Sequence, residues 1–330
     1  MIVTGKIFRI VLFITAAALF ACATASHRDQ LMMDGIHNID GYTFDPSSTV
    51  ESRIAEIPAA TLKEVMREDN RSDYLPYMPT ADERKMFAYY YEKLPVANKR
   101  VMKESLVRIY FIKNYAGAGM ADFVLSKDHK VYTVLYANAE LFSRWISEWL
   151  TYRENSMFKQ GAGDARVEID CGTKYSALMY MLLHETSHLV DYVEPVTPFV
   201  ESKFADAQGL SRKNTPFVER VWDGYAVLAG KFGITENRDL HAYGIALPAI
   251  DASKIRAFYG KLFQTPVVSG YSASNWAEDF ADSVTFYHLT QVLKQPYTVT
   301  IFENGKPVSV YKPMESPIVQ RRWKIIEGMR

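Results

Sequence analysis

Helical spacing of apolar residues appears in the chain from position 50 onward. Residues 50–67 show this spacing and predict one helix. Thr80 and Glu83 form a capping-box sequence directly before the apolar run 86–91, so they predict the start of a second helix. Residues 27–50 hold few periodic apolar positions and several turn formers, which is typical of an irregular lead-in. We therefore expect a helical N-terminal region.

From position 105 the pattern changes to short runs of β-branched and aromatic residues. The runs that predict strands are residues 106–112, 122–125 and 131–136. The connection 126–130 has a length suited to a hairpin between the last two strands. A second hairpin is expected near the C-terminus, where residues 298–302 and 307–311 flank an Asn304-Gly305 turn sequence.

The remaining apolar stretches again have helical spacing. They predict helices over residues 141–152, 176–192 and 275–293. The interval 218–263 is also expected to be largely helical, with breaks at its glycines and at Pro248. Together these elements predict an α+β fold in which a small, mainly antiparallel sheet packs on helices, preceded by the helical N-terminal region.

Composition narrows the classes of protein to consider. The chain has 330 residues, of which 48% are hydrophobic and 23% charged, as in an ordinary globular protein. That length allows one large domain with an appended layer, or two domains. The 38 Lys and Arg residues balance the 38 Asp and Glu residues, so electrostatics gives no reason to expect nucleic acid as a partner.

The first 25 residues have the pattern of an export signal. Lys6 and Arg9 precede an apolar run at positions 10–21 that ends in small residues. This run of 12 residues is too short to cross a bilayer core, which takes about 20 residues of helix. No later segment is long and apolar enough to span a membrane. We therefore expect an exported protein, located in the periplasm, on the outer membrane as a lipoprotein, or outside the cell.

Two cleavage positions are compatible with this signal. Cleavage after Ala25 would release a soluble protein, whereas cleavage before Cys22 in a lipoprotein-like box would leave a lipid tether to a membrane. Phe20 departs from the small residue usual in that box. Either route leaves Cys171 without an intramolecular disulfide partner. Because no base motif accompanies Cys171, we expect it to be a small buried apolar residue.

The segment around position 184 carries the clearest chemical pattern. His184, Glu185 and His188 form His-Glu-x-x-His within an apolar stretch expected to be a buried helix. Residues four apart lie on one helical face, so both imidazoles can point at one ion. The adjacent carboxylate is rotated enough to reach a water at that ion. The pattern predicts a single zinc ion bound by His184 and His188, with Glu185 as catalytic base.

A catalytic zinc site needs a third protein ligand, and residues 275–282 offer one. Glu278 and Asp282 stand one helical turn apart, with Asn275 as a suitable N-cap. We expect Glu278 to bind the metal and Asp282 to accept the free ring N–H of His184. Other downstream carboxylates remain alternatives for the third ligand: Glu201, Glu219, Asp223 and Glu236.

His-Glu-x-x-His followed by Glu-x-x-x-Asp resembles the gluzincin zinc metallopeptidases, and is similar to their anthrax lethal-factor-like branch. In that branch a Tyr seven residues before the ligand Glu assists the tetrahedral intermediate, and Tyr271 has this position. Asp191 matches an acidic residue three positions after the second His. The alternatives are a solvated helix-end carboxylate at Asp191 and other tyrosines as donors, namely Tyr225, Tyr243 and Tyr259. His241 and His288 have no motif around them and are expected to be structural or surface residues.

The resemblance covers residues 174–290, with strands 105–136 as the sheet whose edge binds peptide in that superfamily. It implies a zincin-like metallopeptidase domain over residues 101–295. The helical region expected over residues 26–100 and the C-terminal hairpin and helix expected over 296–330 follow from the sequence pattern, and the resemblance does not extend to them. The implied function is zinc-dependent hydrolysis of a peptide or protein substrate. Two alternatives remain: an envelope binding or scaffold protein that keeps the fold without turnover, and a zinc amidase acting on cell-wall peptides.

Overall fold

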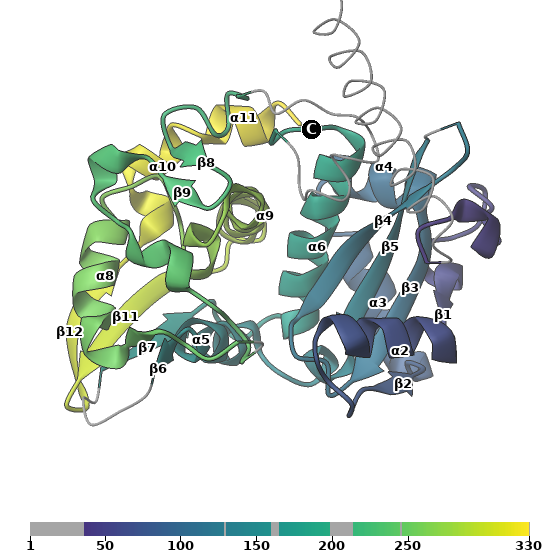
Figure 1. Cartoon of the computed structure of the whole chain (residues 1–330), viewed down its shortest axis with the longest axis horizontal. Helices are drawn as coiled ribbons and strands as arrows, with labels where there is room; N and C mark the ends of the chain where they lie inside the picture. Colours follow the sequence, from purple (N-terminus) through teal and green to yellow (C-terminus); the bar gives the residue numbers. More distant parts are fainter. Residues whose placement is uncertain (1–35, 129, 160–164, 199–213, 245, 330) are drawn as a thin grey trace, which may run out of the picture.

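The computed structural model describes residues 36–128, 130–159, 165–198, 214–244 and 246–329. The expected export signal, with Cys22, lies outside these residues. The fold mixes helices and sheets, which confirms the α+β class. Figure 1 shows two halves, one built around the main sheet and the other around α8, α9 and the C-terminal strands. Within the described part of the chain, no helix is long and apolar enough to cross a membrane.

The main sheet has five strands in the order β1-β3-β5-β4, with β2 also paired to β3. Their bounds are Ile54–Ala55 (β1), Leu75–Tyr77 (β2), Leu106–Lys113 (β3), Gly119–Leu125 (β4) and Val131–Asn138 (β5). The expected hairpin is confirmed, because β4 and β5 are antiparallel neighbours. However, β1 and β5 both run parallel to β3, so the sheet is mixed and not mainly antiparallel. Strand β4 is at an edge of the sheet.

Helices cover both faces of this sheet, because alternate strand residues point to opposite sides. One face packs against α2 (Ala59–Glu68) in a small apolar cluster. The other face packs against α4 (Val96–Ser105) and α6 (Ala177–Val193) in the main core, to which α3 (Ala81–Tyr91) also contributes. Every α6 residue from Ala177 to Tyr192 is buried, as expected for a helix that is apolar nearly all round.

A capping box and a proline determine where two of the N-terminal helices begin. The capping box at Thr80 and Glu83 is confirmed at the start of α3. The helix expected over residues 50–67 starts only at Ala59, because Pro58 disfavours helical geometry at the residue before it. Residues 54–55 form β1 instead, so this region supplies two strands to the main sheet as well as helices.

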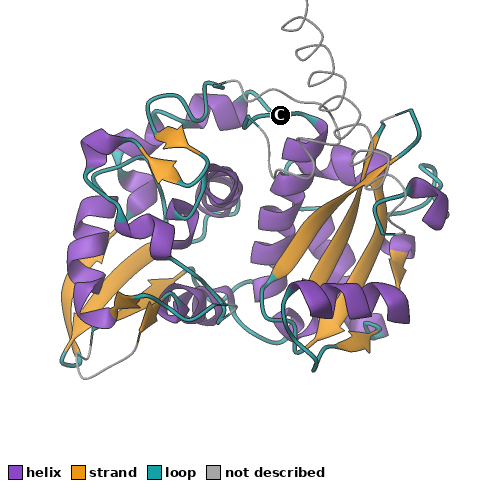
Figure 2. Ribbon diagram, in the orientation of Figure 1, coloured by secondary structure: helices purple, strands orange, loops and turns teal. Residues whose placement is uncertain are grey.

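The second half contains its own sheet and the helix α9. The sheet has the order β12-β11-β7, and Figure 2 shows it apart from the main sheet. Its strands are β7 (Arg166–Asp170), β11 (Thr298–Glu303) and β12 (Lys306–Tyr311), and the Asn-Gly hairpin between the last two is confirmed. Helix α9 (Trp276–Tyr287) continues as a π-helical turn over His288–Val292. Shorter helices surround them: α5 (Ile146–Ser156), α10 (Pro317–Gln320) and α11 (Trp323–Glu327).

The expectation of a largely helical interval at residues 218–263 is wrong. Only α8 (Ile255–Leu262) is an α-helix in its described part. Short strands occupy the rest, with β8 (Trp222–Gly224) paired to β9 (Val227–Leu228) and β10 (Ile250–Asp251) paired to β6 (Phe158–Lys159). Gly233, Tyr243 and Gly244 have positive φ angles, which a right-handed helix excludes.

Candidate metal centre

Two helices from different halves of the molecule meet at the centre of the structure. Helix α6 lies on the main sheet, and α9 belongs to the other half (Figure 1). The side chain of Asn275 accepts hydrogen bonds from the backbone N–H groups of Ala277 and Glu278, which confirms Asn275 as the N-cap of α9. This cap fixes the first turn of α9, and Glu278 in that turn faces α6.

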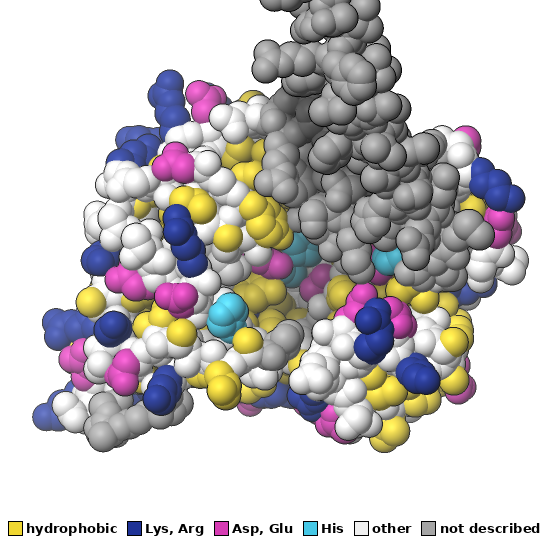
Figure 3. Space-filling view, in the orientation of Figure 1, with side chains coloured by type: hydrophobic (Ala, Val, Ile, Leu, Met, Phe, Trp, Pro, Cys, Tyr) yellow, Lys and Arg dark blue, Asp and Glu magenta, His cyan; other side chains and the backbone are white. Residues whose placement is uncertain are grey.

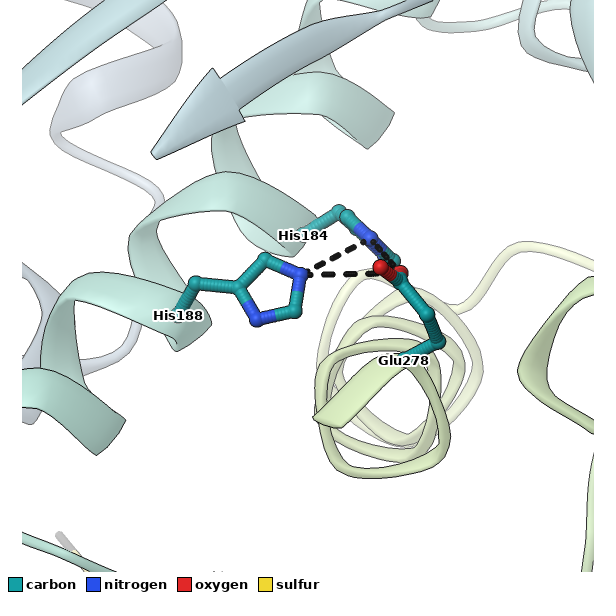
Figure 4. A group of neighbouring side chains, drawn as sticks. All are labelled: His184, His188 and Glu278. Carbon is teal, nitrogen blue, oxygen red and sulfur yellow. Dashed lines mark hydrogen bonds and ion pairs between the residues drawn. The ribbon is translucent and has the colours of Figure 1, made fainter. Parts of the chain in front are cut away.

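The structure brings His184, His188 and Glu278 together (Figure 4). His184 Nε2 lies 2.9 Å from Glu278 Oε2 and 3.3 Å from His188 Nε2. His188 Nε2 lies 3.6 Å from the same Glu278 oxygen. The three side chains come from two turns of α6 and the first turn of α9, so the predicted convergence of the three residues is confirmed.

These separations suit a zinc ion. With zinc–nitrogen and zinc–oxygen bonds of about 2.0–2.1 Å, the ligand atoms of a tetrahedral site stand roughly 3.3–3.4 Å apart. The distances of 2.9, 3.3 and 3.6 Å bracket that value. Two imidazoles and one carboxylate are also the donor set of many catalytic zinc sites. The residues present therefore fit the metal that the sequence predicts.

Asp282 orients one of the imidazoles, as expected. His184 Nδ1 lies 2.9 Å from Asp282 Oδ1, so the ring can donate its second N–H to the carboxylate and present Nε2 to the metal position. The other Asp282 oxygen accepts a hydrogen bond of 2.6 Å from the Ser269 hydroxyl. Tyr180 donates to Oδ1 at 3.0 Å. The carboxylate is thus held from several sides.

A buried arginine, which sequence reasoning missed, stands behind Asp282. Arg153 of α5 lies 3.0 Å from Asp282 and 2.8 Å from the neighbouring Glu154, and each of these side chains is 1% exposed or less. Glu154 in turn accepts hydrogen bonds from the backbone N–H of Gly270 and from the Tyr259 hydroxyl. No motif marks Arg153 and Glu154, which directly follow the helix predicted over residues 141–152 and belong to α5 in the structure.

The charges shift the pKa values of the cluster. Burial alone would lower the pKa of His184, but the hydrogen bonds with Asp282 and Glu278 outweigh it and raise the pKa to about 10. Burial would raise the pKa of Glu278, but the charge of His188 and the bonds with both imidazoles bring it below its usual range. Burial also opposes ionisation of Asp282, yet Arg153 and His184 lower its pKa to about 2. The carboxylates therefore make a site that favours positive charge.

Glu185 faces a cleft of about 270 Å³ beside the three clustered residues. Figure 3 shows the molecule hollowed between its halves, with acidic and histidine side chains at the hollow. Glu185 accepts a 3.0 Å hydrogen bond from the backbone N–H of Ala121 in β4. Burial raises the pKa of its carboxyl. A raised carboxyl pKa is the direction of shift that suits a general base.

The approach of β4 to α6 depends on a glycine. A Cβ atom at Gly119 would lie 2.8 Å from Glu185 Cγ, 2.8 Å from the carbonyl oxygen of Tyr136 and 3.0 Å from Met181 Cγ. Real Cβ contacts essentially never become as short as the first two. Only glycine therefore allows the sheet edge to come this near to Glu185.

Three of the candidate tyrosines line this cleft, namely Tyr225, Tyr243 and Tyr271. The Tyr271 ring centroid lies 5.8 Å from that of His184, and the Arg153 guanidinium lies 4.6 Å from the centre of the Tyr271 ring. Burial raises the pKa of Tyr271 well above its usual value, so its hydroxyl keeps its proton and can donate. Tyr259 is bound to Glu154 and does not line the cleft.

Asp191 is not the solvated helix-end carboxylate considered as an alternative. It is 2% exposed and accepts hydrogen bonds from the backbone N–H groups of Val196 and Thr197 at 2.7 and 2.8 Å. It thus stabilises the turn after α6. Among the described residues, no hydrogen bond joins it to His188, whose buried Nδ1 has no partner there.

The other candidate residues lie apart from the centre. Among the described rivals for the third ligand, Glu219 pairs with Arg220, Asp223 accepts from the N–H of Gly230, and Glu236 pairs with Lys261. Glu201 lies outside the described residues. His288 is structural, because its Nε2 lies 2.7 Å from the carbonyl oxygen of Lys93, and His241 is exposed. Cys171 is buried, as expected.

Comparison with protein-family models, with curated proteins and with solved structures finds no match to this chain. The residues and their geometry are therefore the basis for any functional conclusion.

Proposed function

We propose that the chain is an exported zinc-dependent metallopeptidase of the gluzincin type, with a zincin-like catalytic domain. The observation that carries this proposal is the meeting of His184, His188 and Glu278 beside Glu185, in a cleft bordered by an edge strand. Export rests on the signal-like residues 1–25, in which Cys22 carries a lipid tether if cleavage precedes it. The Asp282 carboxylate, which holds His184 by its second ring nitrogen, adds the support typical of zinc ligands.

In this proposal His184, His188 and Glu278 hold the ion. When bound, zinc supplies a Lewis acid that polarises a carbonyl and lowers the pKa of water toward neutrality. Glu185 takes the proton from the attacking water and passes it to the leaving amine. Its raised pKa suits both steps, because the group must accept and then release a proton near neutral pH. The Tyr271 hydroxyl donates a hydrogen bond to the oxygen that gains charge and keeps its proton.

The substrate is expected to bind along β4 as an added strand. Gly119, Met120 and Ala121 of this strand line the same cleft as Glu185. Strand β4 pairs with β5 on one side only, and no described strand of the main sheet lies on its other side. A peptide placed there would present its backbone to the metal position and to Glu185 together. We therefore expect a peptide or protein substrate in extended conformation.

The test compares wild type with Glu185→Gln. Metal content of both purified proteins is measured by elemental mass spectrometry, and cleavage is profiled on a mixed peptide library. We expect one zinc per chain in both proteins and a fall in kcat/KM of about 10²–10⁴-fold in the variant. Glu219→Gln removes an exposed carboxylate remote from the cleft, and serves as the matched control with unchanged cleavage.

Two outcomes would contradict the proposal. If wild-type protein binds no zinc after reconstitution with the metal, the proposed metal centre is contradicted. Zinc bound by a wild-type protein that cleaves nothing in the library would instead favour a scaffold protein that keeps the site without turnover. Cleavage confined to cell-wall peptides, tested in the same assay, would identify the alternative amidase.

A further inference from the structure

The outer edge of β4 is divided into two parts. Backbone groups of alternate residues in an edge strand point away from the sheet. Here the outward groups include the N–H of Ala121, which donates to Glu185, and the N–H of Leu125, which donates to the carbonyl oxygen of His37 at 2.7 Å. The first part of the edge therefore faces the cleft, and the second part is paired with the segment at His37.

The contacts of His37 are those of a fixed structural residue. Its ring is stacked on Phe123 with the centroids 4.7 Å apart and an angle of 17° between the planes. Its Nδ1 lies 3.0 Å from the carbonyl oxygen of Phe123, to which it can donate. The residue is 3% exposed, and Asn38 forms a parallel bridge with Leu125. The chain at residues 37–38 thus occupies the place that the next strand of the sheet would take.

The groups around His37 also hold the segment in place. Asp122 Oδ1 lies 3.6 Å from His37 Nδ1. The Tyr42 hydroxyl donates to the carbonyl oxygen of Ile36 at 2.7 Å, and Asn38 caps the short helix Ile39–Gly41. These contacts close the turn that leads away from β4, so the segment is fixed from both sides.

We propose that His37 ends the peptide-binding edge of β4 and restricts the substrate to short extensions on that side of the cleaved bond. This inference rests on the proposed peptidase function. A bound chain can pair with the outward backbone groups of residues 119–121 other than the Ala121 N–H, which donates to Glu185. The carbonyl oxygen of Phe123, further along the edge, is taken by the His37 ring. From Ala121 to Phe123 is about 7 Å along a strand, or two residues. The site therefore accepts two or three residues on this side, and the protein cuts near one end of its substrate.

The experiment uses a series of end-blocked peptides built on one cleaved sequence from the library. The segment on either side of the cleaved bond is lengthened separately from one to six residues. For wild type, kcat/KM is expected to fall at least tenfold when one of the two segments exceeds about three residues, and to vary little with the other. His37→Ala opens the edge, so its kcat/KM is expected to vary less than threefold with both lengths.

A conservative variant separates the role of His37 from a general loss of structure. His37→Asn keeps a donor near the place of Nδ1, so it is expected to restore the length limit at least in part. His241→Ala, which changes an exposed histidine outside β4, is expected to behave as wild type. Thermal unfolding of each variant checks that the fold is kept.

Amide hydrogen exchange gives a readout that does not depend on catalysis. The Leu125 amide donates to the backbone carbonyl oxygen of residue 37, and the His37 ring holds this segment on Phe123. Loss of the ring in His37→Ala is therefore expected to release the segment, so that the Leu125 amide exchanges at least tenfold faster than in wild type. Equal exchange rates, or a wild-type kcat/KM that is independent of both lengths, would overturn the inference. If wild type cleaves no peptide, the proposed function fails. Binding of the same peptides, labelled with a fluorophore, to wild type and His37→Ala then decides whether the length limit exists.

Discussion

Helix α9 carries two buried aspartates that look alike and have different surroundings. Asp279 and Asp282 are both fully buried, and each pairs with an arginine that is less than 10% exposed. Asp279 pairs with Arg322 and also accepts from the Trp222 indole N–H at 2.8 Å. Asp282 pairs with Arg153, and its Oδ1 also lies 2.9 Å from His184 Nδ1.

The two aspartates differ in the second side chain that each contacts in addition to its arginine. For Asp279 that partner is a core tryptophan, so the pair connects α9 to neighbouring segments. For Asp282 it is His184, a proposed zinc ligand 2.9 Å away. Burial and an arginine partner therefore do not by themselves identify a functional carboxylate. The following changes test whether the two aspartates differ in function as their contacts indicate.

The largest effect is expected from Arg153→Met. This change leaves Asp282 and Glu154 without the cation between them, so metal-free protein should lose about 3–5 kcal/mol of unfolding free energy. Urea unfolding in the presence of a chelator measures it. Arg256→Met is the matched control, because Arg256 forms an exposed pair with Glu303 and should cost less than about 1 kcal/mol. Equal costs for the two variants would contradict the assigned role of Arg153.

Asp279→Asn is expected to have the next largest effect on the free energy of unfolding. It leaves the Arg322 guanidinium buried with a neutral partner, and should cost about 3 kcal/mol of unfolding free energy. The zinc affinity of the folded variant should stay within about twofold of wild type, because Asp279 does not contact the ligands. Competition with a chromogenic chelator measures that affinity. Zinc binding weakened as much as in Asp282→Asn would remove the distinction between the two aspartates.

Asp282→Asn is expected to act mainly on the metal. An amide in this place gives His184 a weaker acceptor and sets an NH₂ group near Arg153. The zinc dissociation constant should therefore rise roughly 10–100-fold, which is about 1.4–2.7 kcal/mol. The same chelator competition is the measurement, with Asp279→Asn beside it. An unchanged dissociation constant would show that Asp282 does not support the ligand.

The smallest effect is expected in the acid dependence of stability. The pKa of Asp282 is lowered to about 2 in the folded state, against about 3.9 in an unfolded chain. A lowered carboxylate pKa stabilises the fold above the unfolded value, and this contribution is lost as pH falls from about 4 toward 2. Metal-free wild type should lose about 2 kcal/mol more over this range than Asp282→Asn. Urea unfolding at several pH values measures the difference, and parallel curves would contradict it.

Short sequence patterns identified the residues that cluster at the candidate site better than they predicted the fold. Two imidazoles one helical turn apart, and a carboxylate pair with an N-cap at Asn275, are short-range patterns that a single sequence contains. Arg153 and Glu154 were missed because they reach the site from another helix, and only the tertiary fold brings them to Asp282. Which downstream carboxylate completes the cluster was likewise a tertiary question, which the structure answers with Glu278.

The parts of the fold that were predicted correctly are those determined by helix caps and tight turns, which involve residues close in sequence. The capping box at Thr80 and the Asn304-Gly305 hairpin are confirmed, whereas the parallel pairing of β3 with β5 depends on contacts distant in sequence. Strand β7 was missed although buried Val167 and Ile169 alternate with exposed residues, a signal that the sequence does contain. The helical spacing in the interval 218–263 was misleading, because turns with positive φ at Tyr243 and elsewhere interrupt it.

Gly119 has a consequence for how the site could change. A methyl group there would lie 2.8 Å from Glu185 Cγ and from the Tyr136 carbonyl oxygen, which is too close for either pair of atoms. Replacement by alanine would push either the carboxylate or the sheet edge outward, and so change the spacing between a bound peptide and its proton acceptor. The absence of a side chain at residue 119 thus sets the distance between the Glu185 carboxylate and the sheet edge. A single added methyl group would change that distance.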